Sequence, residues 1–165
     1  MTNIVLVGFM GTGKTSVGRL LSQKLSREFL ELDAIIEKKE GVLIKEIFDK
    51  KGEPYFRKLE KDAVIDAMEK KGVVISAGGG AIIDEENFEN FKKNSMIICL
   101  EASPDVILER TKGVTCRPLL NVPEPAKKIE ELLRTREPYY KKADFCINTD
   151  GLSLEQIVDK IVELM

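Results

Sequence analysis

Residues 8–15 read GFMGTGKT and match the spacing G-x-x-x-x-G-K-[ST] without a gap. The apolar run at residues 3–7 predicts a buried strand directly before this segment, and helically spaced apolar residues at 14–26 predict a helix directly after it. This order favours a phosphate-binding loop (P-loop), in which backbone N–H groups and the positive end of the helix surround a phosphate. The alternative is a glycine-rich strand-to-helix turn that fits the pattern by chance.

Two side chains of this loop suit a nucleoside triphosphate. Lys14 supplies a mobile cation for the β and γ phosphates, and the Thr15 hydroxyl can coordinate Mg²⁺. The loop by itself does not distinguish a kinase from an ATPase or a GTPase. The acceptor must therefore be inferred from the rest of the chain.

Predicted strands and helices alternate along the rest of the chain. Short apolar runs predict strands at residues 28–32, 73–76, 96–100 and 145–147. Helical patterns lie between these strands. In chain order they are 34–51 (broken at Gly41), 54–71, 84–93, a helix that begins at Pro104, one that ends near Tyr140, and a last one capped by Ser153 and Gln156. Alternation predicts an α/β fold with a parallel sheet covered on both faces, whose ligands bind past the carboxyl ends of the strands.

Composition and charge exclude several classes of function. The length of 165 residues fits one domain, and a net charge of −2 argues against a nucleic-acid binder. The chain has no histidine, which excludes Ser-His-Asp catalysis and histidine zinc sites. Its three cysteines form no CxxC pair, which argues against a disulfide framework or a zinc site and favours a reduced, cytoplasmic compartment. No signal peptide or membrane span is expected, and a monomer is the default.

Three further segments carry candidate ligand-binding residues. Glu31 and Asp33 lie at the end of the second predicted strand, where alternation places them on one face and a carboxylate could accept a hydroxyl proton; a solvated strand end is the alternative. Arg57 precedes Glu60 by three residues, and a surface ion pair is the interpretation that the spacing favours. Gly78, Gly79 and Gly80 follow the third strand and suggest a ligand close to bare backbone, with a loose loop as the alternative.

Four arginines follow in the second half of the chain. Arg110 and Arg117 flank a stretch with little periodicity, and Arg117 could swing over the phosphates to stabilise charge on the transferring group. Arg134 and Arg136 lie near the end of the next predicted helix. Either could simply complement the carboxyl end of that helix.

Together these residues resemble the shikimate kinases. The resemblance rests on GFMGTGKT, Asp33, the run I-F-x-x-x-G-E-x-x-F-R-x-x-E at residues 47–60, the three glycines, R-x6-R-P-L-L from Arg110, and Arg136. It covers residues 4 to about 150, in order and spacing. It implies a single three-layer P-loop kinase domain with a five-stranded parallel sheet in the order 2-3-1-4-5. The core would be residues 1–111 and 125–165, the lid loop about 112–124, and the shikimate-binding segment about 33–60.

The resemblance also implies a reaction and a role for each matched residue. ATP would phosphorylate the 3-hydroxyl of shikimate, with Mg²⁺ as cofactor, and ATP and shikimate would be the only partners. Asp33 would bind the substrate hydroxyls as or near the base, and Lys14 and Arg117 would complete the catalytic set. Arg57 and Arg136 would hold the substrate carboxylate beside Gly78, Gly79 and Gly80. The nucleotide and Mg²⁺ would be bound by Gly11, Thr12, Gly13, Lys14, Thr15, Ser16, Arg110 and Arg117.

The chain departs from the family pattern at one chemical position. The family usually has Asp-x-Asp at the end of the second strand, and Glu31 stands at the first of these positions, where it could reach Mg²⁺ through a water molecule. Two other functions remain open: a different small-molecule P-loop kinase, such as one for gluconate, and a non-catalytic domain that senses ATP. Intact Lys14, Thr15, Asp33 and Arg117 argue against the latter.

Overall fold

A five-stranded parallel sheet forms the centre of the protein, with the strands in the order β2-β3-β1-β4-β5. The computed structural model describes residues 1–113 and 118–165. The predicted α/β class and strand order are confirmed. The strands are β1 (Asn3–Val7), β2 (Phe29–Glu31), β3 (Val74–Ser76), β4 (Ser95–Glu101) and β5 (Phe145–Asn148).

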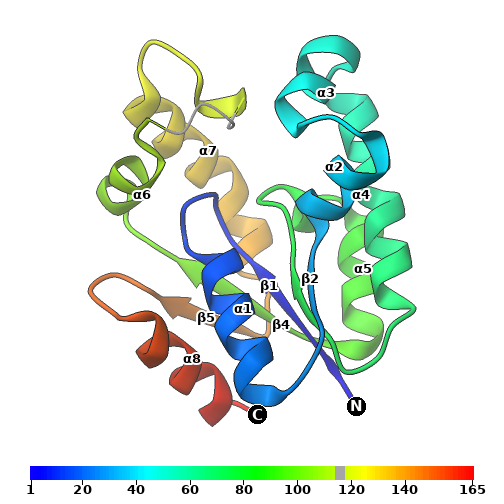
Figure 1. Ribbon diagram of the computed structural model, residues 1–165. Coiled ribbons are helices and arrows are strands. Elements are labelled where there is room, and N and C mark those ends of the chain that lie inside the picture. The colour runs from blue at the N-terminus through cyan, green and yellow to red at the C-terminus, as the bar shows by residue number, and fades with distance from the viewer. Residues whose placement is uncertain (114–117) are drawn as a thin grey trace.

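Helices cover both faces of this sheet, as Figure 1 shows. α1 and α8 pack on one face, where the strand residues Ile4 and Leu6 join their apolar side chains in one core cluster. Val5 and Val7 point to the opposite face, into the larger cluster that contains residues of α2, α4, α5, α6 and α7. The helices are α1 (Lys14–Leu25), α2 (Leu32–Glu40), α3 (Ile44–Lys51), α4 (Glu53–Met68), α5 (Glu85–Asn94), α6 (Pro104–Thr111), α7 (Pro125–Tyr140) and α8 (Leu154–Glu163), with the short 3₁₀ turns η1 (Ala81–Ile83) and η2 (Pro118–Leu120).

The continuous apolar runs of the sequence follow from burial on both faces. All five residues of β1 are buried, and so are all three of β3. A parallel strand covered on both sides has no solvent face, so its sequence does not alternate between apolar and polar residues. The central strands therefore hold the loops at their carboxyl ends on a rigid base.

The predicted helix boundaries need two corrections. α2 starts at Leu32 rather than residue 34, which places Asp33 in its first turn. α4 ends at Met68 rather than near Lys71, and a turn leads on to Gly72. The predicted break at Gly41 is confirmed: this residue ends α2 with φ 71°, a conformation that glycine adopts without steric cost.

The loops that follow β1, β2 and β3 lie together at the carboxyl end of the sheet. α2 and α3 extend beyond this end on one side, and α6 and α7 on the other (Figure 1). Ligands of such folds bind at this end. Within the described residues, no helix has the length and apolarity needed to cross a bilayer.

Candidate active site

The segment between β1 and α1 has the shape of a P-loop. Gly8, Gly11 and Gly13 adopt φ angles of 135°, 79° and 96°, a region that other residues enter at a cost. A side chain at Gly8 would also overlap the backbone carbonyl oxygen of Leu100 on β4. Glycine is therefore required here twice, by its backbone angle and by the close approach of the neighbouring strand.

Lys14 lies inside this loop. Its side chain is 9% exposed, and its Nζ donates hydrogen bonds to the carbonyl oxygens of Gly8 at 2.8 Å and Phe9 at 2.9 Å. The ammonium group is thus held within the concavity of the loop, as a phosphate ligand must be. The predicted strand, loop and helix are confirmed, and the chance strand-to-helix turn is not what the residues form.

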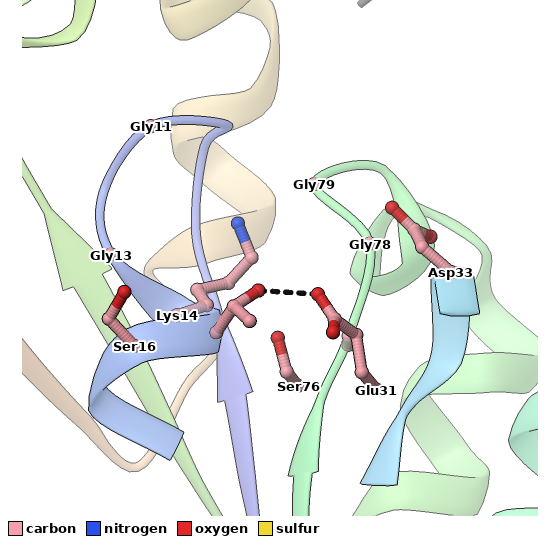
Figure 2. A pocket seen from close by; sticks show the side chains of 11 residues that line it. Gly11, Gly13, Lys14, Ser16, Glu31, Asp33, Ser76, Gly78 and Gly79 are labelled. Carbon is pink, nitrogen blue, oxygen red and sulfur yellow. Dashed lines mark hydrogen bonds between the residues drawn. The ribbon is translucent and has the colours of Figure 1, made fainter. Parts of the chain in front are cut away.

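A first cavity of about 220 Å³ opens beside the loop. Figure 2 shows Lys14 on one side of it, Asp33 on the other, and Glu31 and Ser76 between them. Ser76, at the end of β3, is a lining residue that the sequence patterns did not single out. The full lining is Gly11, Gly13, Lys14, Thr15, Ser16, Glu31, Asp33, Ser76, Ala77, Gly78 and Gly79.

Two oxygen donors meet in this first cavity. The Thr15 hydroxyl donates to Glu31 Oε1 at 2.6 Å (Figure 2), and Arg19 approaches Glu31 Oε2 at 3.4 Å. Because the Thr15 proton is directed at Glu31, the lone pairs of the hydroxyl oxygen are left for a cation. Hydroxyl and carboxylate oxygens are donors that suit Mg²⁺. The longer side chain of Glu31 therefore does reach Thr15, and the residues present fit a magnesium ion.

A second cavity of about 280 Å³ adjoins the first. The two share Glu31, Asp33, Gly78 and Gly79, so that one ligand in each would meet at these residues. The walls of the second cavity combine apolar rings with two arginines. Its lining is Met10, Glu31, Asp33, Ala34, Glu37, Ile44, Phe48, Phe56, Arg57, Glu60, Gly78, Gly79, Gly80, Leu119 and Arg136.

Asp33 reaches the junction of the cavities from a helix, not from a strand. The prediction that Glu31 and Asp33 share a strand face is wrong, because β2 ends at Glu31 and Asp33 belongs to the first turn of α2. Both side chains nevertheless line both cavities. The change from an extended to a helical backbone at residue 32 separates the two carboxylates, with Glu31 on Thr15 and Asp33 beside Gly78.

The three consecutive glycines leave room for charged side chains. A Cβ atom at Gly78 would lie 2.6 Å from Glu60 Oε2, and one at Gly80 would lie 2.7 Å from the nitrogens of Arg57. At Gly79 it would lie 3.3 Å from Arg136 Nη1. None of the three needs glycine for a positive φ. The packing around these residues favours a close approach of side chains over a loose loop, because the missing Cβ atoms let three ionic groups lie against the backbone.

The ion pair predicted between Arg57 and Glu60 is present, but not at the surface. Arg57 Nη1 donates to Glu60 Oε1 at 2.8 Å, and Glu53 contacts the same guanidinium at 3.1 Å. Glu60 is 1% exposed, and its Oε2 has no hydrogen-bond partner within the described part of the chain. Burial raises the pKa of Glu60, Arg57 only partly offsets this, and Asp33 raises the pKa further. Burial alone would lower the pKa of Arg57, but Glu60 and Glu53 raise it.

Arg136 and Arg134 have different environments although they are two residues apart on α7. Arg136 is 5% exposed, lines the second cavity and lies 5.5 Å from the Phe9 ring centroid. Arg134 lines a separate cavity behind the P-loop. Of these two arginines, only Arg136 lines the same cavity as Arg57. The last turn of α7 contains no basic residue, so the interpretation of either arginine as a complement to the helix end is wrong.

Sequence reasoning missed Tyr140 and the aromatic wall. The Tyr140 hydroxyl donates to the Gly79 carbonyl oxygen at 2.7 Å, and burial raises the pKa of this phenol to about 12. Phe48 and Phe56 pack with ring centroids 4.9 Å apart and line the second cavity. Both lie in the run at residues 47–60, so a signal existed for them, whereas nothing in the sequence links Tyr140 to Gly79.

A third cavity, of about 410 Å³, is lined by residues of the P-loop and of α8. It is distinct from the cavity that Arg134 lines. It shares Gly13 and Ser16 with the first cavity, and Arg110 lines it while donating to the Gly11 carbonyl oxygen at 3.2 Å. The loop before α8 forms its far wall. Arg117, predicted to close over the phosphates, lies outside the described residues.

Comparison with known proteins identifies the family to which this chain belongs. The profile of the family described as shikimate kinase matches residues 10–165. The chain belongs to the shikimate kinase family. A shikimate kinase of Thermodesulfovibrio yellowstonii is 50% identical to this chain, and the matched region covers 99% of this chain and 94% of that protein. The solved shikimate kinase of Acinetobacter baumannii, in complex with shikimate, is 39% identical with a TM-score of 0.97 over 99% of this chain and 92% of its own. That of Aquifex aeolicus is 40% identical, with a TM-score of 0.86 over 98% of this chain and 94% of its own.

The buried carboxyl group of this shikimate kinase family member makes stability depend on pH. The pKa of Glu60 is raised in the folded state, so the folded protein binds a proton here more tightly than the unfolded chain does. Lowering the pH from neutral toward the ordinary value of 4.5 should therefore favour the wild type over Glu60→Gln. The free energy of unfolding in urea, measured for both proteins across this range, checks the trend.

The control for this measurement is Glu53→Gln, which removes the other, more exposed carboxylate on Arg57. It separates the loss of a partner for Arg57 from the titration of a buried group. A difference between wild type and Glu60→Gln that stays constant with pH would contradict the raised pKa.

Proposed function

We propose that this shikimate kinase family member transfers the γ-phosphate of ATP to the 3-hydroxyl of shikimate through the cavities that meet at Asp33. One observation carries the proposal: the P-loop cavity and the arginine-lined cavity share Glu31, Asp33, Gly78 and Gly79. A triphosphate in the first and a hydroxylated acid in the second would bring the γ-phosphorus and the attacking oxygen together. Such positioning supplies much of the rate in phosphoryl transfer.

Asp33 is the proposed proton acceptor. Its carboxylate lines both cavities, so it faces the point where an acceptor hydroxyl would approach the phosphate. The hydroxyl oxygen forms a bond to the γ-phosphorus, the bond from that phosphorus to the bridging oxygen of ADP breaks, and the hydroxyl proton passes to Asp33. Lys14, held in the loop beside it, stabilises the negative charge of the phosphates.

Arg57 and Arg136 are the proposed partners of the shikimate carboxylate. Both line the second cavity, and a planar guanidinium can bind a carboxylate through two parallel hydrogen bonds. Glu60 accepts a hydrogen bond from Arg57 and so positions its guanidinium group. The Tyr140 hydroxyl donates to the carbonyl oxygen of Gly79 and so positions that backbone segment. The backbone N–H of Gly79, within Gly78–Gly80, is left to bind a substrate hydroxyl, while Phe48 and Phe56 cover the apolar face of the ring.

The nucleotide is proposed to lie across the first and third cavities. Residues Gly11–Ser16 surround the phosphates, and Arg110 lies beside the adenosine end of the third cavity. Thr15 would bind Mg²⁺ directly and Glu31 would bind it directly or through water. The ion would neutralise charge on the phosphate oxygens. Arg117, on the predicted lid, is proposed to act on the same phosphates.

The two alternatives are less well supported. Gluconate also carries a carboxylate, but full-length similarity to shikimate kinases at up to 50% identity favours shikimate. A domain that only senses ATP would need no second cavity with two arginines next to the P-loop. The test is to mix the protein with Mg·ATP and measure ADP release with shikimate, with gluconate and without acceptor. Release that requires shikimate supports the proposal, and release with gluconate alone overturns the substrate.

Asp33→Asn should lower kcat about 10²-fold or more while ATP still binds, because the amide keeps the shape but cannot take up the proton. Steady-state kinetics with shikimate and calorimetric titration with ATP measure the two quantities. Asp62→Asn, an exposed change on α4, is the matched control. Turnover of Asp33→Asn near that of the control would exclude Asp33 as the base.

Arg136→Ala should raise the KM for shikimate about 10-fold or more, the scale of a lost hydrogen bond to a charged group, with a smaller effect on the KM for ATP. Arg134→Ala is the matched control because the same side chain, two residues away, lines a different cavity. Equal effects of the two substitutions on shikimate KM would remove Arg136 from the substrate site.

A further inference from the structure

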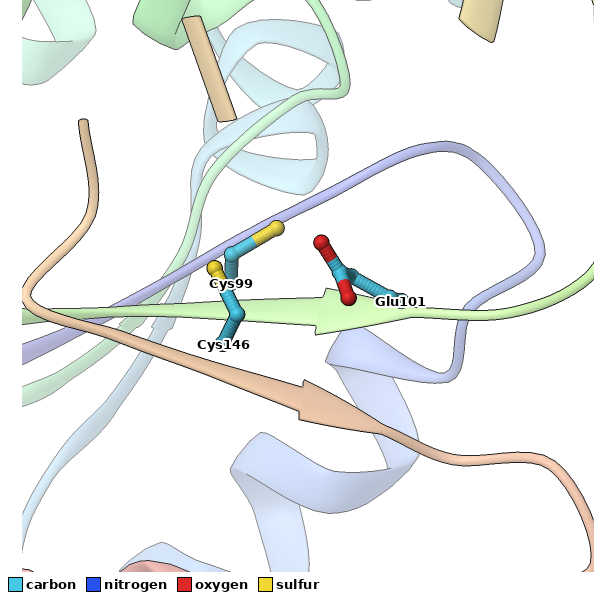
Figure 3. Close-up of side chains that lie close together, drawn as sticks. All are labelled: Cys99, Glu101 and Cys146. Atoms are coloured by element: carbon cyan, nitrogen blue, oxygen red, sulfur yellow. The ribbon is translucent and has the colours of Figure 1, made fainter. Parts of the chain in front are cut away.

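Two cysteines and a glutamate come together where β4 and β5 pair. Cys99 on β4 is in register with Cys146 on β5, so that their side chains lie on the same face of the sheet. Glu101 follows Cys99 by two residues and points to that face as well. Figure 3 shows the Glu101 carboxylate facing the Cys99 sulfur, with Cys146 beside them. The two sulfurs and a carboxylate oxygen all lie within 4.8 Å of one another.

This spacing fits a single thiophilic metal ion. Zinc binds cysteine sulfur at about 2.3 Å and carboxylate oxygen at about 2.0–2.2 Å, so tetrahedral ligands of one ion lie about 3.8 Å or less apart. Small side-chain rotations close the remaining gap, and the hydrogen-bonded strands keep the Cα atoms in place. Each thiol also makes a long contact with the backbone: Cys99 Sγ with the Leu100 carbonyl oxygen and Cys146 Sγ with that of Tyr140, both at 3.9 Å.

The cluster is also accessible to an ion. Cys99 is buried, whereas Cys146 and Glu101 are exposed. Glu101 lines the cavity of about 280 Å³ behind the P-loop, together with Glu137, Asn148 and Asp150. Two cations lie nearby: Arg134 lines the same cavity, and Lys141 pairs with Glu137 at 2.7 Å. The site therefore has one ligand fixed in the core, two at the surface, and polar space for a water molecule in the fourth position.

We propose that Cys99, Cys146 and Glu101 form a second metal site, which takes one thiophilic divalent cation such as Zn²⁺. Binding converts both thiols to thiolates and releases their protons to solvent. Two thiolates and one carboxylate suit zinc, unlike the oxygen donors Thr15 and Glu31, which suit Mg²⁺. The site is next to the catalytic loop, because Cys99 is also in register with Val7, the residue before Gly8. This proposal departs from the expectation, drawn from the spacing of the cysteines, that they form no zinc site.

Cadmium is the sharpest probe, since its thiolate complexes absorb in the ultraviolet and its oxygen complexes do not. The titration uses reduced protein in a Cys116→Ser background, with excess Mg·ADP present to occupy the P-loop. We expect a thiolate absorption band that saturates at one Cd²⁺ per chain and that Zn²⁺ abolishes by competition. Absence of the band, or oxidation of the two thiols to a disulfide with no Cd²⁺ uptake, would overturn the proposal.

Three substitutions assign the ligands. Cys146→Ser, at an exposed position, should remove the saturable uptake, and so should Cys99→Ala. Glu101→Gln should weaken Cd²⁺ binding by about 10- to 100-fold or more, because even the loss of a residue that only contacts a metal ligand has an effect of this size. Glu130→Gln, an exposed change on α7, should leave binding unchanged. Circular dichroism verifies folding of each variant, and uptake that survives Cys146→Ser would show that the metal is bound elsewhere.

Discussion

The second cavity, which Arg57 and Arg136 line, depends on the contact of charged side chains with the bare backbone of Gly78–Gly80. A Cβ atom at Gly78 or Gly80 would overlap Glu60 or Arg57, and one at Gly79 would lie 3.3 Å from Arg136 Nη1. These charged side chains come from α4 and α7, which are far apart in the sequence, and the glycines let both helices bring ionic groups to the end of β3. A side chain at Gly78 or Gly80 would push Glu60 or Arg57 out of their ion pair, and an unpaired charge in a buried place is costly.

Charged side chains of both signs line the second cavity. Glu60 offers one oxygen to Arg57 and leaves Oε2 beside Gly78, while Asp33 raises its pKa from the neighbouring turn. Two guanidinium groups, those of Arg57 and Arg136, and four carboxylates, those of Glu31, Asp33, Glu37 and Glu60, line this cavity. An incoming carboxylate adds negative charge beside the two arginines, which suits an anionic acceptor. The apolar rings of Phe48 and Phe56 line the same space, and a less polar surrounding strengthens interactions between charges.

The sheet carries two kinds of ligand chemistry at neighbouring positions. β1 leads into the P-loop, which offers backbone N–H groups, the Lys14 ammonium group and the Thr15 hydroxyl. β4, its hydrogen-bonded neighbour, carries Cys99 and Glu101 on the face that Cys146 shares. A metal ion held there would link β4 and β5 through side chains as well as through the backbone. Because Leu100 also contacts Gly8, the position of β4 bears directly on the shape of the catalytic loop.

The sequence by itself determined the class of fold, the P-loop and the order of elements, because apolar periodicity and the glycine and lysine spacing are local properties of the chain. Together with the family resemblance it also indicated Asp33, Arg57 and Arg136, although it placed Asp33 on a strand and Arg57 in a surface pair. Only the tertiary structure decided that Glu60 is buried, that Tyr140 binds Gly79 and that Cys99 faces Cys146. These depend on helix packing and strand register, which join residues distant in the chain and leave no periodic signal within it.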